Sequence, residues 1–250
     1  MEPRSFNVPR YLSVLPLFND LSPAELSQVA AGCQLRRLAR GDMVFHVGDA
    51  CHEFHVVVTG QVKLFVLSPD GHEKVVELIG PGHSFGEAIM FSGIPYILSA
   101  QALAETLQLT VGKAAVIDAI KHDHRFALRM LASMSRKLHR LIQDVEAYAL
   151  HSGLQRVVGY LLREQPVNGD DPEAAHTVTL PVGKAVIASR LSLTPEYFSR
   201  VLHDLEARGL IEIDRREIRI LSTKRLAEFG MHGCSLPPSF AAVEPRSFVM

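Results

Sequence analysis

The segment SLTPEYFSRVLHDLEARGLIEIDRREIRIL, residues 192–221, has the pattern of one amphipathic helix followed by a small hairpin. Thr194 and Pro195 are favoured as the cap and the first residue of a helix, and Gly209 is a typical helix stop. At 100° per residue, one face of this helix is apolar and should pack inward, namely Phe198, Val201, Leu202 and Leu205. The stretch LIEIDRREIRIL then alternates apolar and polar residues about a charged turn, which predicts two short strands.

The opposite face of the predicted helix is polar. The preceding GKAVIASRLSL supplies a short amphipathic helix and a turn of three to four residues. Helix, turn, helix and wing is an arrangement that docks in the major groove of DNA. We therefore predict DNA contacts from Thr194, Glu196, Ser199, Arg200 and His203, and phosphate contacts from Lys184, Arg190, Arg215 and Arg216.

An alternative for the same face is a solvent-exposed ion pair. Glu196 and Arg200 are four residues apart, and such a pair stabilises a helix by roughly 0.3 kcal/mol without any partner.

Composition limits the class of protein. The chain has 250 residues, is 47% hydrophobic and has a formal net charge of −1, which excludes a generally basic nucleic-acid coat protein. Any binding to DNA must come from a local patch. No apolar run reaches the roughly 20 residues that span a bilayer, and the N-terminus lacks the pattern of a secretory signal. Three widely spaced cysteines favour a reducing compartment, so we expect a cytoplasmic protein.

Glycine-punctuated stretches rich in Val, Ile and Phe predict a β-roll over residues 33–121, after an N-terminal helical segment over residues 1–32. One short helix, GEAIMF, should interrupt the roll. A winged helix-turn-helix follows at 151–229 and a flexible tail at 230–250, which gives an α+β fold. The tail repeats EPRSF of residues 2–6, an echo for which we have no physical account.

A long helix is predicted over residues 122–150, capped by Asp123. Its apolar residues recur at alternating steps of four and three, which is a heptad seam. The seam predicts a homodimer, whereas a helix that merely covers its own barrel is the alternative. The seam residues are Ala127, Leu131, Met134, Leu138, Leu141, Val145 and Tyr148.

Residues 15–228 resemble the CRP/FNR superfamily of transcriptional regulators. TPEYFSR matches the Glu-x-x-Ser-Arg signature of the FNR-like branch. The resemblance implies that Glu196 and Arg200 contact base edges and that Ser199 helps to select the outer part of a TTGAT-type half-site. It further implies half-sites about 34 Å apart on a palindrome, with promoter DNA and RNA polymerase as partners.

The same resemblance bears on what the β-roll senses. The family's phosphate-binding element is a Gly-Glu followed by an Arg-Ser pair; here Gly86, Glu87 and Ser99 match, but Leu98 replaces the arginine. Leu141 and Ile142 replace the polar pair near the adenine. Binding of cyclic AMP is therefore not expected, because a charge-assisted contact is lost. The iron–sulfur cluster of the oxygen-sensing branch is not expected either, since three isolated cysteines cannot supply four ligands.

EAIMFSGIPYILSAQA and the DNA-binding end are similar to the dissimilatory nitrate respiration regulator (DNR) group. That similarity implies haem in an apolar cavity between β-roll and dimer helix, with nitric oxide altering an axial ligand and shifting the helix. The predicted effector pocket is Phe85, Glu87, Met90, Leu98, Ser99, Leu138, Leu141 and Ile142.

Two histidines, His83 and His139, are the candidate iron ligands. Two further histidine pairs, His52 with His55 and His122 with His124, lack a third ligand and are interpreted as surface residues.

An enzyme is disfavoured, because no nucleophile elbow, phosphate loop or metalloprotease helix motif is present. A regulator of another small effector or of a cyclic nucleotide is the main alternative, and an effector-binding module without DNA activity is another. Target genes are expected to belong to denitrification or nitrogen-oxide respiration, with activation the commoner outcome in the resembling group.

Overall fold

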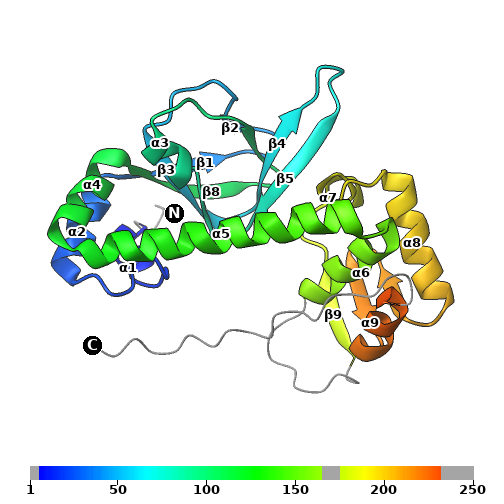
Figure 1. The fold of residues 1–250 in the computed structure, drawn as a ribbon. Coiled ribbons are helices and arrows are strands. Elements are labelled where there is room, and N and C mark those ends of the chain that lie inside the picture. Colours follow the sequence, from blue (N-terminus) through cyan, green and yellow to red (C-terminus); the bar gives the residue numbers. More distant parts are fainter. Residues whose placement is uncertain (1–5, 165–174, 232–250) are drawn as a thin grey trace, which may run out of the picture. The chain divides into compact units, whose positions relative to one another are not determined.

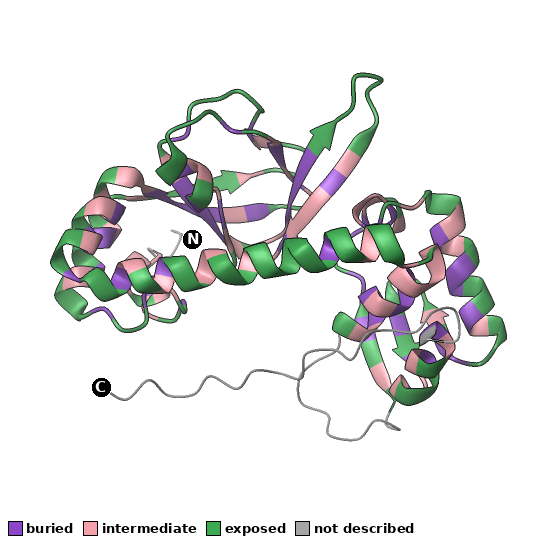
Figure 2. Ribbon diagram, viewed as in Figure 1, coloured by how far each residue is buried: buried purple, intermediate pink, exposed green. Residues whose placement is uncertain are grey.

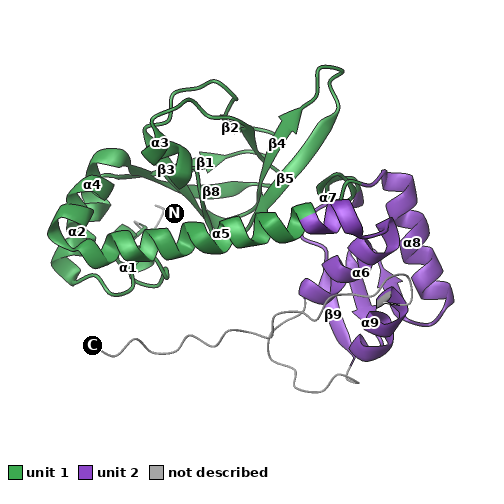
Figure 3. Cartoon of the chain, viewed as in Figure 1, with its two compact units in different colours: residues 1–145, 185–192 green, residues 146–184, 193–250 purple. Residues whose placement is uncertain are grey.

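The computed structural model describes residues 6–164 and 175–231 (Figure 1). The predicted tail, the EPRSF repeat and Cys234 lie wholly or largely outside these ranges. The chain forms two compact units, residues 1–145 with 185–192 and residues 146–184 with 193–250 (Figure 3). In the described ranges, no helix has the length and apolar character needed to cross a membrane.

Two short helices, α1 (Val8–Leu12) and α2 (Pro23–Ala31), open the first unit. The second helix has Ser22 as its N-cap and Gly32 as its C-cap. Ser22 Oγ accepts from the Glu25 backbone N–H, and the Glu25 carboxylate accepts from the Ser22 N–H over 2.7 Å. Such a capping box satisfies two backbone donors that a helix start would leave unpaired.

The β-roll consists of two antiparallel four-stranded sheets, ordered β1-β8-β3-β6 and β2-β7-β4-β5. Their inward faces carry the hydrophobic core of the unit. The predicted α+β class is confirmed, and GEAIMF forms the brief helix α3 (Glu87–Ser92). The strands are β1 (Cys33–Leu38), β2 (Met43–Phe45), β3 (Glu53–Thr59), β4 (Val62–Leu67), β5 (Glu73–Ile79), β6 (Ser84–Phe85), β7 (Ser99–Ala102) and β8 (Thr106–Gly112).

One histidine of β3 corrects the sequence interpretation. His55 was interpreted as a surface residue, yet its side chain is only 2% exposed. The His55 ring stacks on Phe85 and lies within hydrogen-bonding distance of Tyr96 Oη (3.0 Å) and Gln108 Nε2 (2.8 Å). The surface interpretation was wrong because both faces of β3 are covered here, so its residues do not alternate between core and solvent.

Helix α4 (Lys113–His122) leads into the long helix α5 (His124–Leu150). The predicted capping of α5 is confirmed, since Asp123 Oδ1 accepts from the Arg125 backbone N–H over 3.0 Å. Only three of its residues are buried, Phe126, Met130 and Asp144 (Figure 2). Large apolar side chains therefore stand exposed along it in the single chain.

The remaining elements are those of the second unit and α7, most of which belongs to the first unit. A three-stranded sheet ordered β10-β11-β9 accompanies the helices of this region. The last helix continues to Met231, into the segment predicted as tail. The elements are α6 (Gly153–Arg163), β9 (His176–Thr179), α7 (Lys184–Arg190), α8 (Pro195–Ala207), β10 (Ile211–Asp214), β11 (Glu217–Ile220) and α9 (Thr223–Met231).

Candidate nucleic-acid interface and effector site

Helix α8 has the two faces that its sequence predicts. Thr194 caps it, with Oγ1 accepting from the Tyr197 backbone N–H over 3.2 Å, and Pro195 is its first residue. The predicted inward face is confirmed, since four apolar side chains are buried. These are Phe198, Val201, Leu202 and Leu205.

The polar face of α8 is open. Glu196, Arg200 and His203 are exposed and Ser199 is half-buried. Among the described residues, no ion pair joins Glu196 to Arg200. The alternative of a mutual ion pair is therefore not observed, and both charged groups remain available to DNA. The carboxylate can accept from a cytosine amino group and the guanidinium can donate to guanine, without first breaking a contact.

The wing places two arginines at a hairpin turn. Strands β10 and β11 pair so that Asp214 faces Glu217, which leaves Arg215 and Arg216 as a two-residue turn, both exposed. Arg215 has a φ of 54°, in the left-handed region that costs a residue with a Cβ roughly 1–2 kcal/mol. Strain at a surface position of this kind is common at binding sites.

The other two predicted phosphate contacts lie on α7. Lys184 is half-buried, and the Arg190 guanidinium forms an ion pair with Asp144 of α5. Beside it, Lys74 Nζ donates to the carbonyl oxygens of Ser189 (2.7 Å) and Arg190 (2.9 Å). A phosphate contact from Arg190 would have to compete with its pairing to Asp144.

The Gly86–Glu87 element contacts other residues of the same chain. Gly86 has a φ of 86°, and a Cβ there would meet the His55 ring at 3.4 Å. Glu87 is buried, accepts from Ser84 Oγ over 3.1 Å and pairs with Lys137 Nζ of α5. The Glu87 carboxylate therefore has a structural hydrogen-bonding role in this state.

Five of the eight predicted effector residues lie in or against the core, and the other three are exposed on α5. Phe85 and Met90 are packed in the core, Ser99 Oγ accepts from the Val47 N–H, and Leu98 packs against the core. Leu138, Leu141 and Ile142 are 60%, 42% and 57% exposed on α5. Helical geometry puts those three on the seam side of α5.

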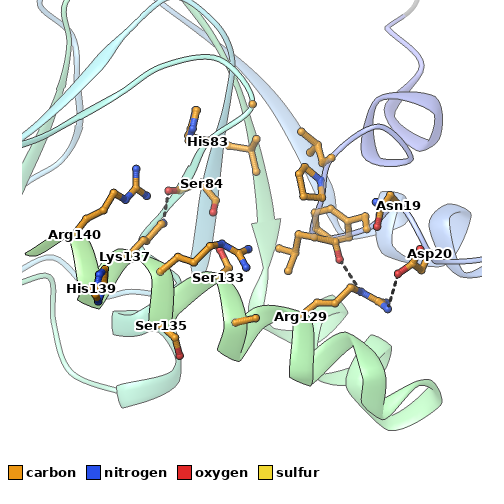
Figure 4. Close-up of a pocket in the computed structure, with 18 residues that line it drawn as sticks. Asn19, Asp20, His83, Ser84, Arg129, Ser133, Ser135, Lys137, His139 and Arg140 are labelled. Atoms are coloured by element: carbon orange, nitrogen blue, oxygen red, sulfur yellow. Dashed lines mark hydrogen bonds and ion pairs between the residues drawn. The ribbon is translucent and has the colours of Figure 1, made fainter. Parts of the chain in front are cut away.

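A cavity of about 1000 Å³ lies instead against another side of α5 (Figure 4). Its walls come from residues 15–20, from residues 82–84 and from α5 between Arg129 and Arg140. Both candidate iron ligands, His83 and His139, line it. Segments more than 100 residues apart in sequence build this site, which sequence reasoning missed.

The two histidines differ in their ring contacts. His83 Nδ1 donates to the Pro81 carbonyl oxygen over 3.1 Å, which leaves Nε2 as the acceptor nitrogen. A metal-binding histidine usually donates its other ring N–H to a carboxylate, a backbone carbonyl or water, which orients the ring. His139 Nε2 instead lies 3.2 Å from Gln143 Nε2. Neither in this cavity nor elsewhere in the described ranges could a group of three or more His, Cys, Asp or Glu side chains hold a metal ion.

Two family models match this chain in the order of its units. A cyclic nucleotide-binding domain matches residues 35–123, and a Crp-like helix-turn-helix domain matches residues 155–229. The chain belongs to the CRP/FNR family of transcriptional regulators. The two matched domains lie in one chain, with the cyclic nucleotide-binding domain first.

Three CRP/FNR relatives illustrate the likeness. The CRP-like cAMP-activated global transcriptional regulator of Mycobacterium tuberculosis is 24% identical over 84% of this chain and 94% of its own. The structure of FixK2 from Bradyrhizobium japonicum has a TM-score of 0.70 and 23% identity over 78% of this chain and 96% of its own, which is a likeness in fold. The structure of DNR from Pseudomonas aeruginosa is 35% identical over 88% of this chain and 96% of its own, with a TM-score of 0.47.

Proposed function

We propose that this CRP/FNR regulator binds promoter DNA as a cytoplasmic homodimer, recognises a TTGAT-like palindrome and activates genes of denitrification or nitrogen-oxide respiration. The observation that carries the DNA-binding part is the exposed row Glu196, Ser199 and Arg200 on a helix whose other face is buried. Arg200 reads guanine and Glu196 reads the cytosine amino group in each half-site. RNA polymerase is the partner through which bound protein acts.

A gel shift tests the DNA-binding function directly. The purified protein should retard a TTGAT–N4–ATCAA duplex at concentrations that leave a duplex with scrambled half-sites unbound. The affinity should fall steeply with salt, because Lys184, Arg215 and Arg216 displace counterions from phosphates. Equal retardation of both duplexes would contradict sequence-specific binding.

Dimerisation through α5 follows from its exposed apolar seam. Leu131 is 55% exposed, Leu138 60% and Val145 65%, which is costly for a single chain in water. A second copy of α5 would bury these side chains as a coiled coil does.

Leu138→Asp should convert the dimer to a monomer and abolish gel-shift activity, because it places a charge in the seam. Gln143→Asp is the matched control, since Gln143 is also exposed on α5 but lies about 140° around the helix from Leu138. Sedimentation equilibrium measures the change. A monomeric wild type, or equal dissociation of both variants, would contradict the proposed seam.

We further propose that the signal is nitric oxide and that haem in the cavity receives it. The cavity fits such a group: its volume lies at the upper end for ligand pockets, Leu15, Leu17, Phe18 and Val56 offer apolar walls, and His83 is oriented as a metal ligand. Bound haem would supply an iron that takes up nitric oxide. The protein's own part is to hold that group between residues 82–84 and α5, the helix of the dimer seam.

His83→Ala should remove the Soret shift that wild-type protein shows on mixing with haem, because the imidazole that would hold the iron is lost. His139→Ala should leave the shift unchanged and serves as the matched control, since it removes the other cavity imidazole. Absorbance spectra with and without nitric oxide give the readout. Wild-type protein without a Soret shift would overturn the haem proposal and leave the DNA-binding proposal intact.

Cyclic AMP is not the proposed ligand, although the Mycobacterium tuberculosis relative is named for it. Leu98 carries no charge for a cyclic phosphate, and Glu87 is already paired with Lys137. Adding cyclic AMP to the gel shift should change nothing.

A further inference from the structure

Helix α5 carries an unusual excess of positive charge. From His124 onward, five Arg or Lys residues precede its first carboxylate, Asp144. Three of the five are neutralised. Arg125 pairs with Asp123 at 3.0 Å, Arg129 pairs with Asp20 at 3.5 Å and lies 3.7 Å from Asp123, and Lys137 pairs with Glu87.

The other two cations, Arg136 and Arg140, have no such partner. Within the described part of the chain, no ion pair or hydrogen bond engages either guanidinium. They stand four residues apart on one face of the helix, where like charges repel and destabilise it. Half-buried Glu77 acts on Arg140 only at longer range: burial raises the pKa of its carboxyl group, and Lys137, Arg140 and Arg190 oppose that rise.

Both arginines line the cavity (Figure 4 labels Arg140). Among the described residues of its lining, four permanent cations, Arg129, Arg136, Lys137 and Arg140, face a single carboxylate, that of Asp20. The walls opposite are apolar, with Leu17 and Phe18 among them. A site of this composition suits a ligand that has an apolar body and an anionic group at its edge.

We propose that Arg136 and Arg140 form an anion-binding site that anchors the carboxylate, sulfonate or phosphate group of an apolar effector in this cavity. The planar fork of arginine pairs with such groups through two parallel hydrogen bonds. The bound anion would also relieve the repulsion between the two guanidinium groups. The site is separate from the Gly86–Glu87 element, which does not line the cavity.

Two sources could supply the anionic group. The propionates of haem are one, which rests on the proposed function above. A haem-free anionic effector is the other, and the site does not require haem.

A pair of matched probes tests the anion site alone. 1-Anilinonaphthalene-8-sulfonate and N-phenyl-1-naphthylamine share their rings and differ by the sulfonate. Arg136→Gln/Arg140→Gln should weaken the sulfonate probe at least about tenfold, since each hydrogen bond to a charged group contributes roughly 1.5–3 kcal/mol. Its affinity for the neutral probe should stay within about twofold.

Arg37→Gln/Arg40→Gln is the control variant. It removes the same charge from exposed arginines outside the cavity and should bind both probes as wild type does. A circular-dichroism melt confirms that both variants are folded. The proposal is overturned if wild-type protein does not bind the sulfonate probe, or if the Arg136/Arg140 variant binds it unchanged or loses both probes equally.

Binding of haem and of haem dimethyl ester shows whether the propionates of haem supply the anionic group. If haem is the effector, the Arg136/Arg140 variant should weaken haem about tenfold and leave the ester unaffected. If wild-type protein binds the sulfonate probe but neither haem nor the ester, the haem proposal fails and the anion site stands.

Discussion

Arg200→Ala should reduce affinity for the TTGAT–N4–ATCAA duplex by at least about thirtyfold, since each bidentate arginine–guanine contact contributes roughly 1–3 kcal/mol and a dimer makes two. The loss should be confined to specific binding. Arg200 is exposed and unpaired among the described residues, so the variant should melt within about 1 °C of wild type. Fluorescence anisotropy with the specific and the scrambled duplex separates the two effects.

Arg225→Ala is the matched control for this change. It removes an exposed arginine from α9 of the same unit and should lower affinity for both duplexes alike and only slightly. If Arg200→Ala behaved in the same way, Arg200 would be a phosphate contact and not a base-reading residue.

Acidification should destabilise the sensor unit through His55. Burial lowers the pKa of this imidazole from 6.5 to about 3. Between these two values the unfolded chain binds a proton that the folded chain does not, so folding stability rises with pH. The stabilisation is complete above about pH 6.5 and falls by about 1.4 kcal/mol per pH unit as the pH drops below it, until about pH 3.

His55→Gln isolates this contribution. The variant should be less stable at neutral pH, because hydrogen bonds to Tyr96 and Gln108 are weakened, yet its stability should fall less steeply than that of wild type between pH 6 and pH 5. Urea denaturation at each pH gives the slopes. Should the variant not fold, the His55 ring resonances of wild type give the answer, and a titration near pH 6.5 would contradict the burial argument.

Local periodicity explains why much of the DNA-binding end could be predicted. The buried row Phe198, Val201, Leu202 and Leu205 repeats at helical spacing, and Thr194 and Pro195 mark the helix start. The hairpin about Arg215 is read from neighbouring residues in the same way. Such features depend on contacts within a few residues, which a sequence displays directly.

The effector site could not be predicted in this way. Residues 15–20, 82–84 and 129–140 meet only because the N-terminal segment, the loop before β6 and α5 fold against one another. The excess of cations on α5 can be read from the sequence, but the sequence does not show which of these cations form ion pairs with carboxylates. Asp20, Asp123 and Glu87 neutralise Arg129, Arg125 and Lys137, and nothing in the described chain does so for Arg136 and Arg140.

The sequence by itself determined the order of the elements, the two faces of α8 and the apolar seam of α5, because helix and turn patterns repeat over a few residues. Only the tertiary structure decided that His55 is buried, that Arg190 pairs with Asp144 and that His83 shares a cavity with His139. The physical reason is that burial and charge pairing depend on which distant segments are brought together. A single strand or helix does not contain that information.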